Sequence, residues 1–219
     1  MTRMTRLDIS CMKPYWASYL ILIAVTLFQY GLGTPVTALV TTSTMYALML
    51  STTVFSLQER FNLDLLYGTL ALNQRDIIQG RYSMIMLHYL FVLVMGLSPL
   101  VLNFLPLPLV SVPSPEPYEL LLSIAVSFTL FSLFASFQLP LLFRYGYSKA
   151  RWLALLPFLV MAIIVMFIMN ASGTTSFVSN LDAILNQPAF LLPIAGLICL
   201  GSIFLSYRLS LVAYAKAQA

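Results

Sequence analysis

Apolar residues dominate this chain in long runs, and short polar connections separate the runs. A helix that crosses a bilayer needs roughly 20 mostly apolar residues, and six runs have about that length. Backbone N–H and C=O groups cannot stay unpaired in lipid, so each run predicts a helix rather than an extended segment. The six predicted spans are 15–32, 36–57, 83–105, 118–143, 152–170 and 190–207.

The composition of the chain agrees with this pattern. Of its 219 residues, 60% are hydrophobic and only 8% are charged, and the mean hydropathy is +0.92. A soluble domain has about 25% charged residues and about 45–50% apolar ones, so a water-soluble globule of this composition would lack a polar surface. We therefore expect one all-α membrane domain over residues 1–219.

The basic residues alternate from one connection to the next. They fall before the first predicted span, between the second and third, between the fourth and fifth, and after the sixth: Arg3, Arg6, Lys13, Arg60, Arg75, Arg81, Arg144, Lys149, Arg151, Arg208 and Lys216. The other connections hold Glu116, Glu119 and Asp182. Because basic loops stay on the cytoplasmic side, the pattern predicts six spans with both termini in the cytoplasm.

The connection 58–82 is the longest of the predicted inner connections. A stripe of apolar and small residues recurs there at helical spacing: Phe61, Leu65, Leu66, Thr69 and Leu70. Asn73 and Asp76 resemble a capping box, which predicts that a new helix begins near Asn73 and enters the third span. The amphipathic helix is either a docking surface for a cytoplasmic motor or a helix that lies on the lipid surface.

Two cytoplasmic segments carry a family resemblance. The first reads QERFNLDLL at 58–66 and LALNQRDIIQGRY at 70–82, and the second reads LPLLFRYGYSKAR at 139–151. The chain resembles the permease subunits of type-2 ABC exporters, in particular the small six-span permeases encoded beside a separate ATPase. Ala71 stands where that group usually has Pro, and Arg81 stands where Lys is common.

The resemblance implies a coupling helix over 61–72 that seats in a groove of an ABC ATPase subunit. The docking set is then Glu59, Arg60, Phe61, Leu65, Leu66, Thr69, Leu70 and Arg75, and a second cytoplasmic patch consists of Arg144, Gly146, Tyr147, Lys149 and Arg151. It also implies a second permease subunit, identical or homologous, and a bacterial plasma membrane. The implied cargo is hydrophobic or amphipathic, either a toxin- or bacteriocin-like peptide or a lipophilic drug.

Motifs for chemistry are missing from the sequence. No G-x-x-x-x-G-K-[ST] loop is present, so we expect ATP and Mg to bind the partner ATPase and no cofactor to bind this chain. His88 is the only histidine, and Cys11 and Cys199 lie far apart, so no catalytic residue and no metal site are expected. Membrane orientation accounts for the net charge of +4, so nucleic acid is not an expected partner.

Two functions remain open at the level of sequence. The first is the exporter permease, and the second is a non-transporting membrane protein such as an immunity or scaffold protein. No acidic residue lies deep in a predicted span, which favours an external motor over a proton or sodium gradient. The sequence leaves open the identity of the cargo, the choice between homodimer and heterodimer, and whether His88 or the Met-rich stretches contact cargo.

Overall fold

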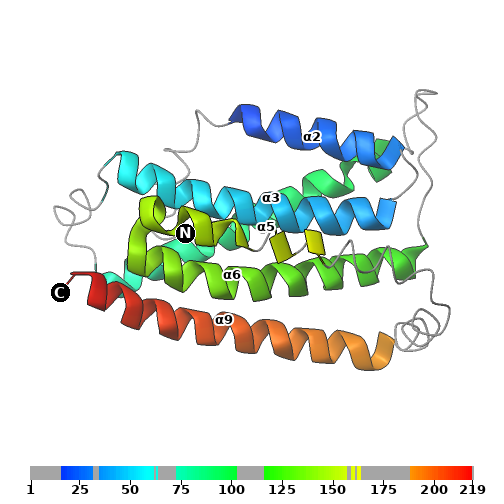
Figure 1. Cartoon of the computed structure of the whole chain (residues 1–219). Coiled ribbons are helices and arrows are strands. Elements are labelled where there is room, and N and C mark those ends of the chain that lie inside the picture. Colours follow the sequence, from blue (N-terminus) through cyan, green and yellow to red (C-terminus); the bar gives the residue numbers. More distant parts are fainter. Residues whose placement is uncertain are drawn as a thin grey trace.

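The computed structural model describes residues 16–31, 35–61, 63, 73–102, 116–156, 159–160, 162–163 and 188–218. The long elements of this part are all helices: α2 (Trp16–Gly31), α3 (Pro35–Arg60), α5 (Gln74–Leu102), α6 (Pro117–Ala154) and α9 (Pro188–Gln218). They run side by side along one long axis (Figure 1). Helix α6 packs against α3 on one side and α9 on the other, and α3 also packs against α5 and α2.

Five of the six predicted spans fall on these helices. The fifth predicted span, 152–170, lies mostly outside the described residues. Within the described part, three helices are long and apolar enough to cross a membrane, namely Gln74–Leu100, Pro117–Ala150 and Leu192–Lys216, and Tyr19–Tyr30 is a shorter apolar helix. The prediction of an all-helical membrane protein is thus confirmed, while six spans and cytoplasmic termini stay predictions.

Helix α3 is less apolar than these three helices because it contains many threonine and serine residues. Several of these side chains face other helices. Thr42, Ser43 and Thr44 are buried. The Thr44 hydroxyl lies 3.3 Å from the Ser127 hydroxyl on α6, and the Tyr89 hydroxyl of α5 donates to Ser127 Oγ at 3.3 Å. Small and hydroxyl side chains allow close approach and hydrogen bonding between helices in a membrane. Helix α3 therefore occupies the interior of the bundle.

Several helices extend beyond the predicted spans. Helix α5 begins at Gln74, and the backbone N–H groups of Asp76 and Ile77 donate to the Asn73 carbonyl at 2.9 and 3.2 Å, so the predicted helix start at Asn73 is confirmed. The segment 144–151 was expected to be a connection between two spans. In the structure it continues α6 across a bend at Gly146, because the backbone turns within one residue and needs no separate loop.

Candidate functional site

One end of the bundle gathers most of the exposed basic residues of the part that the structure describes. It is formed by the C-terminal ends of α3 and α9, the start of α5 and the bend of α6 at Gly146, and we call it the basic end (Figure 1). Its exposed cationic side chains are Arg60, Arg75, Arg144, Lys149 and Lys216. Helices that are far apart in sequence thus place their charges on one surface.

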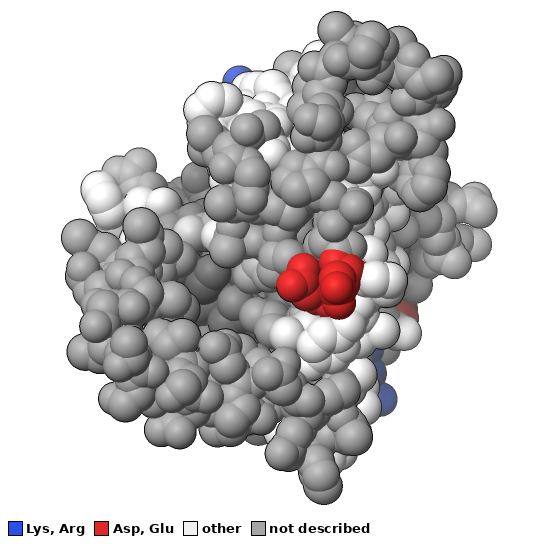
Figure 2. Space-filling view, turned by 90° about the vertical axis from the view of Figure 1, so that its right-hand side faces the viewer, with Lys and Arg blue, Asp and Glu red and all other residues white. Residues whose placement is uncertain are grey.

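The opposite end of α6 carries the opposite charge. Helix α6 begins at Pro117, beside the exposed side chains of Glu116 and Glu119. Figure 2, which views the molecule from the side where α6 begins, shows an acidic patch on this face. The separation of charge along the bundle is the arrangement expected for helices whose basic ends face the cytoplasm.

The two segments that carry the family resemblance meet at the basic end. Glu59, in the last turn of α3, receives the backbone N–H of Ser148 on its two carboxylate oxygens at 3.1 and 3.0 Å. The Ser148 hydroxyl also donates to Glu59 Oε2. A carboxylate is favoured at the start of a helix, where backbone N–H groups have no partner within the helix. Glu59 therefore caps the helical segment that follows the bend.

Gly146 makes this junction possible. Its backbone has φ 72° and ψ 174°, a region that is essentially accessible only to glycine. A Cβ atom at this position would overlap Glu59 Oε1. The absence of a side chain at Gly146 permits both the bend of α6 and the approach of the Glu59 carboxylate. We call the contacts of Glu59, Gly146 and Ser148 the capping junction.

Arg81 joins α5 to the same end of α3. Its side chain is fully buried, its Nη2 donates to Gln58 Oε1 at 2.9 Å, and its guanidinium lies 5.6 Å from the centre of the Phe55 ring. Arg81 precedes the third predicted span and falls in the helix that was predicted to run from Asn73 into that span, and it lies inside α5. Arg81 therefore holds α5 against α3 beside the capping junction.

A cluster of aromatic rings lies next to the capping junction, and we call it the aromatic collar. Phe143 of α6 contacts Phe55 of α3, with ring centres 5.0 Å apart and the rings nearly perpendicular. Phe143 also stacks on Tyr82 of α5 at 6.5 Å and meets Tyr214 of α9 at 5.9 Å. Edge-to-face and stacked aromatic pairs stabilise beyond their buried area. One side chain thus connects four helices.

Tyr82 extends the collar along α9. Its hydroxyl lies 2.6 Å from Ser206 Oγ and 2.9 Å from Ser210 Oγ, and its ring contacts Tyr207 at 5.7 Å. The collar was not predicted, although Tyr82 closes the first recognised segment and Phe143 lies within the second.

The residues of the predicted docking set have different outcomes. Arg60, Phe61 and Arg75 are exposed at the basic end, and Phe61 keeps 55% of its surface accessible. Glu59 is half-buried and belongs to the capping junction rather than to the open surface. The remaining members of the set, Leu65, Leu66, Thr69 and Leu70, lie outside the described residues.

The second predicted patch is divided in a similar way. Arg144 and Lys149 are exposed, whereas Tyr147 is half-buried and packs against the main core. Gly146 forms the bend, and Arg151 lies in α6 with its side chain outside the described part.

Exposed aromatic residues accompany the cations of the basic end. Phe61, Tyr145 and Trp152 keep 55, 43 and 69% of their surface accessible. The guanidinium of Arg144 lies 5.1 Å from the centre of the Tyr145 ring. Exposed Trp, Tyr, Phe and Arg side chains are enriched in protein–protein interfaces and their hot spots. The sequence analysis did not single out Tyr145 or Trp152, which therefore extend the candidate surface.

Comparison with known families assigns the chain as a whole. A family model described as ABC-2 family transporter protein matches residues 4–215, which is nearly the entire length. No curated protein and no solved structure gives a match to the chain. The match covers both segments that carry the family resemblance and all of the long helices except the last three residues of α9. The chain therefore belongs to the ABC-2 transporter family, whose members are membrane-embedded transport components.

Proposed function

We propose that this chain is the permease subunit of an ATP-driven exporter that moves hydrophobic or amphipathic cargo out of the cell. Its basic end binds a separately encoded ABC ATPase, which holds the ATP and Mg. Two permease subunits with six spans each enclose the pathway. The family membership supports the transport role, and the docking surface is argued from the geometry of the basic end.

The observation that carries this proposal is the capping junction. A motor that acts on a membrane domain must bind a surface that is rigidly connected to the membrane-spanning helices. Glu59 joins the end of α3 to the segment after Gly146 through hydrogen bonds from the backbone and side chain of Ser148. Hydrogen bonds to an ionised carboxylate are stronger than neutral ones, so two sequence segments move as one docking surface.

The aromatic collar gives this surface a connection to the spans. Phe143 lies three residues before Gly146 and contacts rings from α3, α5 and α9. Packed side chains transmit small displacements because interiors are dense and resist deformation. A displacement of the docking surface is therefore passed to the helices that contact Phe143.

We expect Leu65→Asp combined with Leu66→Asp to detach the ATPase. A buried leucine contributes about 1.5–3 kcal/mol through the hydrophobic effect, so the loss of two anchors weakens the complex on the order of 100-fold or more. The measurement is co-purification of the tagged chain with the product of the neighbouring ATPase gene, followed by titration of the two components.

The matched control is Asn62→Asp combined with Asn73→Asp, which adds two negative charges outside the predicted apolar stripe. We expect the affinity for the ATPase to change by less than about threefold, because residues at the rim of an interface contribute little to binding. Association that survives the two leucine substitutions contradicts the coupling-helix assignment. An intact complex whose ATP hydrolysis responds to no amphipathic peptide contradicts export and favours the scaffold function.

A further inference from the structure

Helices α5 and α9 leave two hollows along the line where they meet. The larger has a volume of about 880 Å³ and lies between residues 79–86 of α5 and 200–207 of α9. The smaller has a volume of about 530 Å³ and lies between Asn73 and the start of α5 on one side and residues 211–216 of α9 on the other. Both hollows are open along the surface of the bundle.

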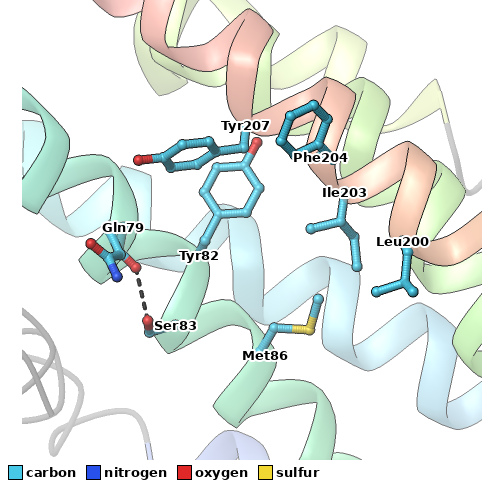
Figure 3. Close-up of a pocket in the computed structure, with 8 residues that line it drawn as sticks. All are labelled: Gln79, Tyr82, Ser83, Met86, Leu200, Ile203, Phe204 and Tyr207. Atoms are coloured by element: carbon cyan, nitrogen blue, oxygen red, sulfur yellow. Dashed lines mark hydrogen bonds between the residues drawn. The ribbon is translucent and has the colours of Figure 1, made fainter.

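The larger hollow is an apolar groove. Tyr82 and Met86 of α5 face Ile203 and Tyr207 of α9 across it, and Leu200 and Phe204 continue the α9 wall (Figure 3). Leu200 and Phe204 keep 71 and 62% of their surface accessible. A methionine and a row of aliphatic and aromatic side chains form an adaptable apolar surface, which suits a hydrocarbon chain.

The smaller hollow is polar and cationic. Arg75 and Lys216 line it together with Asn73 and Gln74. Neither cation forms an ion pair with another residue of the described part. Asp76 lies next to Arg75 in sequence but does not line the hollow. Two cations from different helices thus converge on one space at the basic end.

The two hollows follow one another along the same pair of helices. On α5, the polar hollow ends at Arg75 and the groove begins at Gln79, four residues later. On α9, the groove ends at Tyr207 and the polar hollow begins at Leu211, again four residues later. Four residues correspond to about 6 Å of helix. The candidate spans are Gln74–Leu100 and Leu192–Lys216. In a bilayer that these two helices cross, the polar hollow would be level with the lipid headgroups and the groove with the acyl chains.

We propose that this α5–α9 seam binds one anionic phospholipid, with its phosphate between Arg75 and Lys216 and one acyl chain in the groove. Basic pockets between membrane helices on the cytoplasmic side are suited to anionic headgroups. The cationic hollow disfavours a cationic peptide and favours a phosphodiester. The lipid fills the space between α5 and α9. It lies beside Tyr82 of α5, which belongs to the aromatic collar, and beside Tyr207 of α9, which contacts Tyr82.

The test uses the purified full-length chain in detergent and native mass spectrometry with phosphatidylglycerol and phosphatidylcholine of identical acyl chains. We expect phosphatidylglycerol to be retained in preference to phosphatidylcholine. Arg75→Gln combined with Lys216→Gln lowers the affinity for phosphatidylglycerol at least tenfold. Each basic residue near an anionic headgroup raises the affinity about fivefold. Ile203→Trp fills the groove and lowers retention to a similar extent.

Matched variants separate a site from a general surface effect. Arg144→Gln combined with Lys149→Gln removes two exposed cations of the basic end outside the seam, and Leu197→Trp adds the same bulk at an exposed position of α9 outside the groove. Both leave retention within twofold of the unaltered chain. Equal loss in matched and seam variants, or equal retention of the two lipids, overturns the proposal.

Phosphate competition and disulfide crosslinking distinguish two other occupants. If inorganic phosphate alone displaces phosphatidylglycerol completely, the seam is a phosphate site without a chain site, and the lipid proposal is wrong. If the Ile203→Cys variant forms a disulfide between two copies of the chain through position 203, the groove is an interface between copies, and the proposal is equally overturned.

Discussion

Replacement of Phe143 by alanine is expected to cause the largest loss of stability in the bundle, on the order of 3–5 kcal/mol by comparison with Phe→Ala changes in packed cores. Phe143 is 6% exposed and contacts rings from α3, α5 and α9. Its loss leaves a cavity where four helices meet, and neighbouring rings cannot close it without leaving their own contacts. Thermal unfolding of the purified chain in detergent measures the effect.

Phe137 provides the control for this prediction. It lies on the same helix and keeps 53% of its surface accessible, so Phe137→Ala is expected to lower stability by less than about 1 kcal/mol. Phe143→Leu should fall between the two because it retains much of the buried volume. Equal effects at positions 137 and 143 would contradict the role of the aromatic collar as the contact point of the four helices.

Gly146→Ala is expected to disrupt the capping junction, with a loss of about 2–5 kcal/mol of stability. A side chain in this backbone region costs about 1–3 kcal/mol, and overlap with a packed neighbour costs about 1–3 kcal/mol more. The new Cβ displaces the Glu59 carboxylate, which also removes the cap at Ser148. The measurements are thermal unfolding and the affinity for the ATPase subunit, which we expect to fall about tenfold or more.

A double-mutant cycle separates the two causes at Gly146. Combining Gly146→Ala with Glu59→Ala removes the overlap but keeps the backbone strain, so the double variant should lose less than the sum of the single variants by more than about 1 kcal/mol. Gly201→Ala is the control, since nothing lies within 4 Å of a Cβ there. Strictly additive losses would mean that Gly146 and Glu59 do not interact.

The helices of the bundle could be predicted from the sequence to a large extent, because a long apolar run in lipid must form a helix to pair its backbone N–H and C=O groups. The predicted spans 36–57 and 118–143 correspond to α3 and α6, and the capping pattern at Asn73 predicted the start of α5. The ends of the helices were predicted less well. The sixth span was predicted to end at residue 207, but α9 continues to Gln218, with Ala213 and Tyr214 buried in the bundle. Tertiary packing, which sustains most helices in proteins, is not visible in hydropathy.

The candidate site could be predicted only in part. The two segments that carry the family resemblance were recognisable, yet their contact through Glu59 and Ser148 joins residues 89 positions apart, and no periodicity reports such a pairing. The helix that contains Arg81 was predicted, but its contacts with Gln58 and Phe55 of α3 were not. The aromatic collar was missed because Phe143 and Tyr82 are ordinary members of an apolar pattern.

Photo-crosslinking to the ATPase subunit tests whether the two segments that carry the family resemblance form one docking surface. Benzoylphenylalanine replaces Phe61 in the first segment, Tyr145 in the second and, as a control, Leu121 near the acidic end of α6. The account predicts that positions 61 and 145 both crosslink to the ATPase and that position 121 does not. Crosslinking from position 61 alone, or equal crosslinking from position 121, would contradict it.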